Sequence, residues 1–385
     1  NELKNGELKM KADWKKVKLG DFIELHRGYD LTKDSFIKGP YPVVCSTSIM
    51  GYHNSYKVKG PGVIIGRSGT LGQVQYIKEN YWPHNTTLYV SDFKNNDVLF
   101  VRYFLQNIGT DSVGGGSAVP TLNRNHLSIL DIVVPPLETQ QRIASILSAY
   151  DDLIENNRKQ IKLLEEAAQR LYKEWFVDLR FPGYENVAIV DGVPEGWSYE
   201  RIDSFVELQN GFAFKSDSFD NNGNYKIITI KNVQDGSFDS NNVNKINKIP
   251  SKMPQWCKLE IGDILLSLTG NVGRVCLVTS NNCLLNQRVA KLKSKYPAFT
   301  YTLFRSKDMF VMMNNLANGA AQQNLSPIRT GEQKILKATE EIINKFNAIA
   351  NCYVDKIVML HKQIEILQQA RDKLLPRLMS GDMEV

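Results

Sequence analysis

The chain has 385 residues, of which 42% are hydrophobic and 23% charged, and its formal net charge is +6. This length allows two or three domains that each bury a core, and the composition is that of a globular protein. No apolar run approaches the ~20 residues that cross a membrane, and residues 1–18 lack the apolar core of a signal peptide. The five cysteines are scattered, without a CxxC pair. This composition disfavours a membrane protein and a disulfide-rich secreted domain, and predicts a cytoplasmic protein.

The positive charge is concentrated in two segments. Residues 13–137 contain 13 Lys or Arg and 10 Asp or Glu, and residues 196–334 contain 17 and 11, whereas residues 138–180 contain 7 and 8. Basic globular segments favour a polyanionic partner such as nucleic acid. A solvated surface that is basic without binding anything is the alternative.

A sequence repeat relates the two basic segments. Residues 14–29 return as residues 197–212 with five identical positions, among them Trp14/Trp197, Phe22/Phe205 and Gly28/Gly211. A period of about half the chain is too long for a solenoid and predicts a duplicated domain. Each copy is followed by a long helical pattern, so the duplicated unit includes a helix.

The first copy reads as an α+β domain. In residues 13–137, strands are predicted at 63–65, 74–77, 87–90 and 129–134, and a helix at 98–108. Gly-Pro pairs and the glycine-rich residues 66–72 predict turns or loops. Pro135 and Pro136 end this pattern.

A coiled-coil pattern follows. From Ile143 to Trp175, apolar residues alternate at steps of four and three, which predicts a helix with a seam. The seam includes Ile154, Ile161, Leu164 and Leu171. At 1.5 Å per residue the helix spans roughly 48 Å. Asn157 is a polar seam residue that can fix the register. Ile146, Leu153 and Leu163 flank the seam and remain for further helices.

The second copy repeats this order. Residues 196–334 contain predicted strands at 227–230, 263–266 and 274–278, and the loop at 267–273 matches that at 66–72. In that alignment, Asn286 matches Asn85 and Leu268 matches Arg67. The seam recurs in the last helix with Ile357, Ile364, Leu367 and Leu374. We expect the two helices to pack antiparallel; the alternative is that each seam binds another protein.

One difference between the copies is expected before the last helix. In the first copy, Leu122 to Pro135 spans 13 positions, whereas in the second copy Leu325 to Pro327 spans only two. We therefore expect the second copy to lack the strand before Pro327, and residues 327–333 to lead into the helix.

Catalytic motifs are not recognisable in the sequence. Neither glycine loop has the Lys-Ser/Thr of a P-loop, and there is no GxGxxG, HExxH or nucleophile elbow. Residues 134–137 lack the polar and aromatic side chains of an adenine methyltransferase motif. His53 and His84 could be metal ligands, but isolated histidines more often serve the surface or the core. We therefore predict no catalytic residue and no metal site, with a self-contained nuclease or methyltransferase, or a coiled-coil scaffold without a DNA role, as alternatives.

Three motifs resemble the DNA specificity subunit of type I restriction-modification systems. They are the repeated opening at Trp14 and Trp197, the proline-glutamine segment 135–143, and the segment 371–381. The resemblance covers the chain from Trp14 to its end. It implies two similar α+β target recognition domains separated by two long antiparallel coiled-coil helices, in a pseudo-twofold duplicated arrangement. The implied limits are 1–137 for recognition domain 1, 138–183 for a central helical spacer, 184–334 for recognition domain 2 and 335–385 for a C-terminal helical region.

The resemblance also implies a function. Each domain would read one half of a bipartite, asymmetric site in double-stranded DNA, and the helices would set the gap between the halves. The chain itself would be non-catalytic and without cofactor. The implied partners are two modification subunits, which use S-adenosylmethionine to methylate adenine N6, and two ATP- and Mg-dependent restriction subunits.

Candidate DNA-reading residues are those on predicted loops, because arginine pairs with guanine and asparagine or glutamine with adenine in the major groove. In the first domain they are Tyr52, His53, Asn54, Arg67, Ser68, Asn85 and Arg124. In the second they are Lys215, Asn232, Thr269, Asn271, Arg274, Gln287, Arg288, Gln322 and Gln323.

Overall fold

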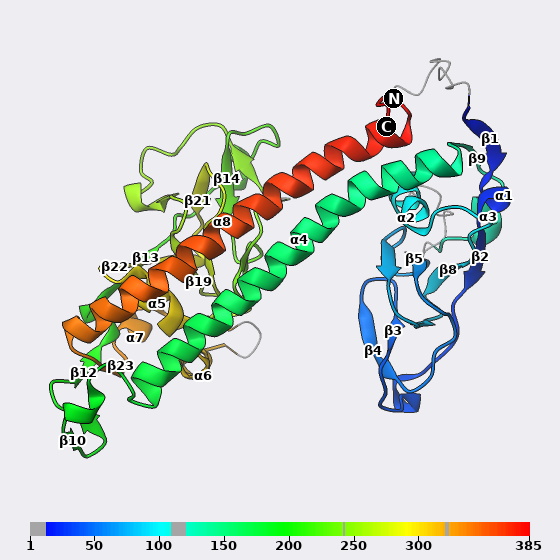
Figure 1. Ribbon diagram of the computed structural model, residues 1–385. Helices are drawn as coiled ribbons and strands as arrows, with labels where there is room; N and C mark the ends of the chain where they lie inside the picture. The colour runs from blue at the N-terminus through cyan, green and yellow to red at the C-terminus, as the bar shows by residue number, and fades with distance from the viewer. Residues whose placement is uncertain (1–12, 109–120, 242, 320–322) are drawn as a thin grey trace. The chain divides into compact units, whose positions relative to one another are not determined.

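The computed structural model describes residues 13–108, 121–241, 243–319 and 323–385 (Figure 1). The chain divides into two compact units, one formed by residues up to Leu153 with Leu367–Val385, the other by Ile154–Ile366. Each unit contains an α+β domain and part of two long helices, α4 (Leu137–Tyr172) and α8 (Glu340–Met379). The predicted fold class, a duplicated α+β domain with two long helices, is confirmed. None of the described helices has the length and hydropathy that crossing a bilayer requires.

Unit 1 is built on three sheets. The largest has the order β2-β8-β5-β6, from β2 (Glu24–Arg27), β8 (Thr87–Asp92), β5 (Gly62–Gly66) and β6 (Val74–Ile77). A second has the order β4-β3-β7, from β4 (Ile49–His53), β3 (Tyr41–Val44) and β7 (Trp82–Pro83). Strand β1 (Lys15–Lys18) pairs antiparallel with β9 (Asp131–Val134).

Short helices complete unit 1: α1 (Leu19–Phe22), α2 (Val98–Asn107) and α3 (Arg124–Ser128). Helix α2 begins after Asp97, whose side chain accepts a hydrogen bond from Phe100 N at 2.8 Å and so caps the helix. The rings of Phe100 and Phe104 are fully or largely buried beside Phe22. The core of the domain therefore lies between α2 and the β2-β8-β5-β6 sheet.

Unit 2 has the same plan. Its main sheet has the order β13-β22-β19-β20, from β13 (Val206–Asn210), β22 (Val289–Ser294), β19 (Ile264–Ser267) and β20 (Val275–Leu277). A second sheet has the order β17-β14-β21-β18, from β17 (Lys245–Ile246), β14 (Tyr225–Ile228), β21 (Cys283–Leu285) and β18 (Lys258–Leu259). The helices are α5 (Pro297–Phe304), α6 (Lys307–Leu316) and α7 (Pro327–Gly331). Two small hairpins are added, β10 (Ile189–Val190) with β11 (Val193–Pro194), and β15 (Val233–Gln234) with β16 (Ser237–Phe238).

The repeated glycine shows why the two copies share a framework. A Cβ atom on Gly28 would lie 2.1 Å from the carbonyl oxygen of His84, and one on Gly211 would lie 2.2 Å from that of Asn286. Any side chain would clash there, so both copies need glycine where the backbone directly after β2 or β13 approaches the turn that precedes β8 or β22. The repeat in the sequence thus encodes the same close contact twice.

The expectation that the second copy lacks a strand is wrong. Strand β23 (Lys334–Lys337) follows α7 and pairs antiparallel with β12 (Ser198–Arg201), just as β9 pairs with β1. Pro327 begins α7, the counterpart of α3, and does not correspond to Pro135. Helix α8 begins at Glu340, beyond the strand. The domain limit predicted at 334/335 therefore falls inside β23, while the other limits stay predictions.

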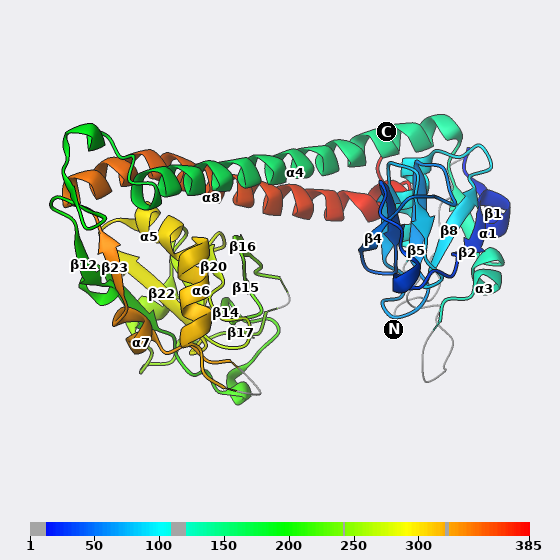
Figure 2. The same ribbon diagram turned by 90° about the horizontal axis from the view of Figure 1, so that it is seen from below.

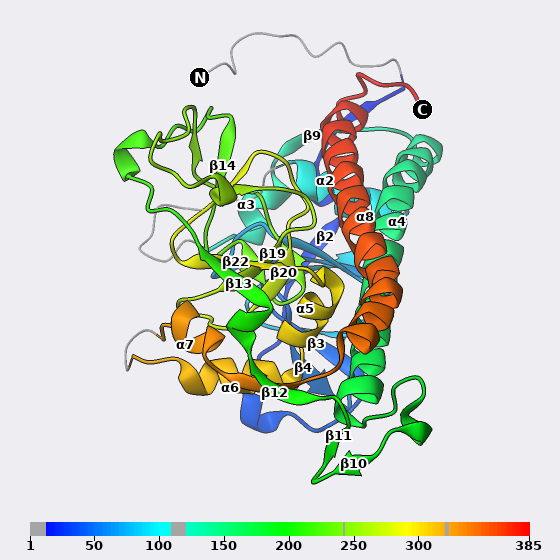
Figure 3. The same ribbon diagram turned by 90° about the vertical axis from the view of Figure 1, so that its left-hand side faces the viewer.

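The two long helices pack antiparallel within each unit (Figures 2 and 3). In unit 2, Asn157 of α4 donates a hydrogen bond to Gln363 of α8 at 3.3 Å, and the ring of Tyr172 meets that of Phe346. The coiled-coil seam is confirmed. Among its predicted members, Ile154, Ile161, Ile357 and Ile364 are buried, whereas Leu164, Leu171, Leu367 and Leu374 are half-buried. Helix α4 ends at Tyr172 and is followed by a π-helical turn over Lys173–Val177.

Candidate nucleic-acid interface

Four loops of unit 1 meet at one junction. Arg67 N donates to the carbonyl oxygen of Thr86 at 2.8 Å, and Leu122 N donates to that of Arg67 at 2.9 Å. The buried hydroxyl of Ser46 donates to the carbonyl oxygens of Ser68 and Thr86, at 2.7 and 2.6 Å. Because Arg67 is held through its backbone N–H and carbonyl groups, its side chain is not needed to maintain the junction.

Arginines surround an open pocket at this junction. The pocket has a volume of about 350 Å³, and the residues that line it are His26, Arg27, Arg67, Leu88, Thr121, Leu122, Asn123 and Arg124. It contains three guanidinium groups and no carboxylate. Within the described part of the chain, the side chains of Arg67 and Arg124 have no hydrogen-bond or ion-pair partner. Unpaired guanidinium groups are suited to phosphate oxygens and to the O6/N7 edge of guanine.

Unit 2 has the same junction with different side chains. Leu268 N donates to the carbonyl oxygen of Arg288 at 3.0 Å, and Leu325 N donates to that of Leu268 at 2.7 Å. Gly270 N bonds the carbonyl oxygen of Gln323 at 2.9 Å. The backbone therefore places Leu268 where unit 1 has Arg67, as predicted, and Arg288 where unit 1 has Thr86.

The predicted match of Asn85 with Asn286 is wrong by one residue. His84 N bonds Val44 O, and Asn286 N makes the equivalent bond to Ile228 O, both close to 3 Å. Asn286 is therefore the counterpart of His84, and Gln287 is the counterpart of Asn85. A single extra residue in the second copy, between the glycine loop and this turn, causes the shift.

Several candidate residues lie exposed on the surface. At the two junctions or beside them, these are Arg124, Asn271, Gln287, Arg288 and Gln323, with Arg67, Ser68 and Thr269 half-buried. Asn54 and Lys215 are exposed on other loops, whereas Tyr52 is exposed but lies in strand β4, so its predicted loop position is wrong. Gln322 lies outside the described residues. The structure thus brings the candidates near the glycine loops together at the two junctions, whereas Tyr52, Asn54 and Lys215 lie elsewhere.

Four other candidates are engaged in internal contacts. His53 is buried, and its Nδ1 accepts a hydrogen bond from Ile37 N at 3.0 Å. Asn232 is buried and bonds Thr229 and Asp239 within a turn. The Asn85 side chain donates to Asp30, and the Arg274 guanidinium donates to Gln234.

Arg27, His26 and Asn123 line the pocket but were not among the predicted residues. Arg27 lies inside the repeated motif, at the end of β2, where the second copy has Asn210. This difference within an otherwise matching repeat could have identified Arg27 as a candidate DNA-reading residue. The repeat keeps Leu25 and Gly28 for the framework, and that framework does not require arginine at position 27.

A charged cluster in unit 1 joins α2 to both long helices. Tyr103 Oη donates to Asp151 at 2.6 Å, and the guanidinium groups of Arg102 and Arg371 lie 2.9 and 2.6 Å from the same carboxylate. Burial opposes ionisation of Asp151, but the hydrogen bonds from Tyr103 and Arg371 and the two positive charges outweigh it, so its pKa is lowered. The domain is therefore fixed to its helices by a charge-assisted network.

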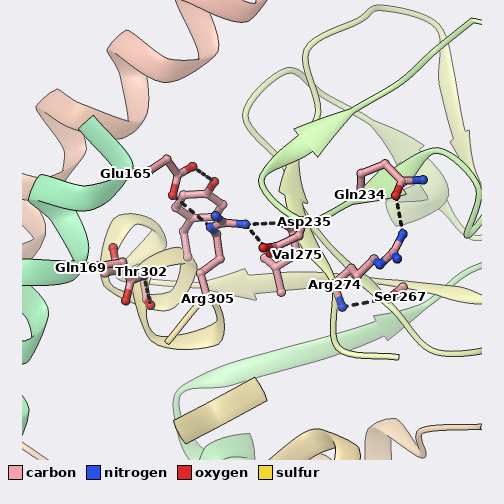
Figure 4. A network of polar contacts seen from close by, with 10 residues as sticks. Glu165, Gln169, Gln234, Asp235, Ser267, Arg274, Val275, Thr302 and Arg305 are labelled. Atoms are coloured by element: carbon pink, nitrogen blue, oxygen red, sulfur yellow. Dashed lines mark hydrogen bonds and ion pairs between the residues drawn. The ribbon is translucent and has the colours of Figure 1, made fainter. Parts of the chain in front are cut away.

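Unit 2 has a comparable cluster on α5, which lies between the main sheet and the long helices (Figure 2). Arg305 Nε donates to Glu165 of α4 at 3.0 Å, and Tyr301 Oη donates to the same carboxylate. Burial and the neighbouring Glu165 raise the pKa of Tyr301, which keeps it a donor. Gln169 Nε2 adds a bond to the carbonyl oxygen of Thr302 at 3.0 Å (Figure 4).

The described residues contain no group of three or more His, Cys, Asp or Glu side chains that could hold a metal ion. The polar groups that the structure does assemble are guanidinium, amide and hydroxyl groups at the loop junctions. Such groups recognise anions and base edges.

Comparison with known proteins identifies the family. The model of the type I restriction modification DNA specificity domain matches residues 11–166 and 194–335, and the chain belongs to that family. It is 27% identical to the type I restriction enzyme MjaIX specificity subunit of Methanocaldococcus jannaschii, over 71% of this chain and 65% of that relative. It is 25% identical to the MjaVIII specificity subunit of the same organism, over 98% of this chain and 95% of the relative.

A solved structure supports the fold. The S subunit of a type I restriction-modification system from M. genitalium aligns with a TM-score of 0.62 and 17% identity, covering 98% of both chains. The two matches of the family model correspond to the two α+β domains, so the family assignment and the observed duplication agree.

Proposed function

We propose that this chain is the DNA-reading subunit of a type I restriction-modification complex, with each α+β domain binding one half of a bipartite, asymmetric site. The observation that carries the proposal is the duplicated loop junction. Its backbone hydrogen bonds are equivalent in the two units, whereas its side chains differ: Arg67 is replaced by the buried Leu268, and Thr86 by the exposed Arg288. A common scaffold with different side chains suits two domains that read different sequences.

The chain acts in this proposal as a non-catalytic subunit in the cytoplasm. Two modification subunits, which bind S-adenosylmethionine, would methylate adenine N6, and two ATP- and Mg-dependent restriction subunits would complete the nuclease. The chain itself would bind no cofactor. Support comes from the family assignment and from the clusters of arginine and amide side chains, which are suited to DNA rather than to covalent chemistry.

The exposed faces of the long helices fit a role in assembly. Ile146 and Leu163 of α4 are 38% and 63% exposed, and their counterparts in α8, Ile349 and Ile366, are 41% and 65% exposed. Apolar side chains that repeat at equivalent positions on two helices are suited to pack against helices of partner subunits. The duplication supports one modification subunit for each copy.

Methylation mapping tests the proposal. A host that carries this gene and its partners should methylate adenine in one bipartite motif, and deletion of this gene should abolish methylation of that motif. An unchanged methylation pattern after deletion contradicts the proposal. Nuclease or methyltransferase activity of the purified chain alone would favour the self-contained enzyme instead.

A further inference from the structure

Unit 2 contains a hairpin that has no equivalent among the described residues of unit 1. In unit 1, β3 ends at Val44 and β4 begins at Ile49. In unit 2, the equivalent strands β14 and β17 are joined by the much longer segment from Ile228 to Lys245, which forms the β15–β16 hairpin. The equivalence follows from the parallel pairing of β3 with β7 and of β14 with β21.

The turn of this hairpin is held by Arg305 (Figure 4). Arg305 Nη1 lies 2.6 Å from Asp235 Oδ1, while its Nε donates to Glu165 on α4 at 3.0 Å. The side chains of Arg305 and Glu165 are only 14% and 12% exposed, whereas that of Asp235 is 76% exposed. One buried guanidinium therefore connects the long helix to a surface turn.

The fit of the turn against Arg305 is close. Gly236 has a φ of +68°, and a Cβ atom there would lie 2.8 Å from both terminal nitrogens of the guanidinium. Arg305 Nη1 also donates to the carbonyl oxygen of Val275 on β20, at 3.3 Å. The hairpin is thus positioned against both the main sheet and α5.

The same hairpin contacts the candidate DNA-reading residue Arg274. Gln234, next to Asp235, accepts a hydrogen bond from the guanidinium of Arg274 (Figure 4). The backbone of Arg274 belongs to the loop junction, since its N–H donates to Ser267 Oγ at 3.0 Å and Ser267 Oγ donates to Asn271 O at 2.5 Å. In unit 1 the equivalent residue is Gln73, whose amide reaches Thr47 O in the short connection at 3.4 Å.

We infer that Arg305 is a positioning residue for DNA specificity in the second domain: it fixes the β15–β16 turn through Asp235, and Gln234 in that turn orients Arg274 at the junction. The inference rests on the proposed function. It assigns to the hairpin a specificity role in one half-site only, because the described residues of unit 1 contain no equivalent hairpin. Arg305 itself lies behind the turn and acts through Arg274.

The test uses the complex with its modification subunits and DNA libraries in which one half-site at a time is randomised. The half-site of the second domain is assigned as the one whose selection changes in Arg288→Ala. Asp235→Asn and Gln234→Ala should each reduce base discrimination in that half-site about five-fold or more at one position. The double variant should reduce base discrimination no more than the stronger single variant does, because both substitutions act through the orientation of Arg274. Selection at the other half-site should stay unchanged.

Two further variants separate positioning from folding. Arg305→Lys keeps the charge but cannot contact Glu165 and Asp235 at once, so it should reproduce the loss seen in Asp235→Asn. Asp239→Asn, directly after β16, keeps an oxygen that can accept the hydrogen bond from Asn241 N and should leave base discrimination unchanged. Unchanged selectivity in Asp235→Asn, or an equal loss at both half-sites, overturns the inference. Absence of any sequence preference in the wild-type complex overturns the proposed function itself.

Discussion

Arg371 Nη1 of α8 lies 2.6 Å from Asp151 Oδ1 of α4, so one ion pair joins the two long helices within unit 1. The same carboxylate holds Tyr103 and Arg102 of α2. The helix pair and the recognition domain of this unit therefore depend on one partly buried charge.

Replacement of Asp151 should destabilise unit 1. Asp151→Ala leaves Arg102 and Arg371, which are 19% and 25% exposed, without their shared carboxylate. We expect a loss of about 2–3 kcal/mol in the free energy of unfolding, measured by urea denaturation. Asp152→Ala, one residue along and exposed, is the matched control and should stay within about 0.5 kcal/mol of wild type.

The contribution of Asp151 should also depend on pH. The folded-state pKa of Asp151 is lowered, so its stabilisation is complete above the unfolded pKa of about 3.9 and is lost as the pH falls through the folded value. The difference in unfolding free energy between wild type and Asp151→Asn should be constant near pH 6–7 and shrink below pH 4. A difference that grows on acidification contradicts the assignment.

Charges on the exposed helix faces should prevent assembly without unfolding the chain. Leu163→Glu and Ile366→Glu place a carboxylate in an apolar patch that we propose packs against the modification subunits. Co-purification should fall at least about ten-fold, because burying an unpaired charge is costly. Ile129→Glu is the control, since Ile129 is 66% exposed and Ile366 is 65% exposed, but Ile129 is not on a long helix. Equal binding by all three variants would refute this docking surface.

The junction arginines should act on separate half-sites. Arg67→Ala and Arg288→Ala each remove a guanidinium group from a different loop junction, so each should weaken binding by about 1–3 kcal/mol. Competition binding with single-base variants of the site measures this, and the affected base pairs should lie in opposite halves. Arg142→Ala, on the exposed face of α4, should leave selectivity unchanged. A uniform loss for every sequence would indicate phosphate contacts instead.

The long helices should set the spacer between the half-sites. Seven residues inserted after Leu153 in α4, matched by seven after Ile366 in α8, preserve the seam and add roughly 10 Å. The recognised spacer should lengthen by about three base pairs at 3.4 Å each, with both half-sites unchanged. Methylation mapping measures the motif. Altered half-site sequences would show that the helices do more than separate the domains.

Much of this architecture was predictable from local patterns. The strands at 63–65, 74–77 and 87–90 and the helix at 98–108 were recovered with small shifts of their ends. The seam was predictable because burial of one helix face requires apolar residues at alternating steps of four and three in the sequence. The alignment of Leu268 with Arg67 was also predictable, because glycines at equal spacing follow both residues in the two copies.

The errors came from contacts between distant segments. Lys334–Lys337 has lysine at both ends and only two apolar residues, and it becomes a strand because β12 supplies the hydrogen bonds. His53 has the composition of a loop residue but is buried against Trp82 by the pairing of β3 and β4. Local sequence cannot show either, because β12 lies far along the chain from β23, and Trp82 of β7 lies outside the segment that contains His53.

The backbone bonds at the loop junction bear on how such a protein can evolve. The carbonyl groups of Thr86 and Arg288 accept equivalent backbone hydrogen bonds, from residues 67 and 268, whether the side chain is threonine or arginine. A mutation there changes what faces outward while the fold keeps its anchoring bonds. In a protein that reads DNA through such a junction, a new target sequence would need only single substitutions, at little cost in stability.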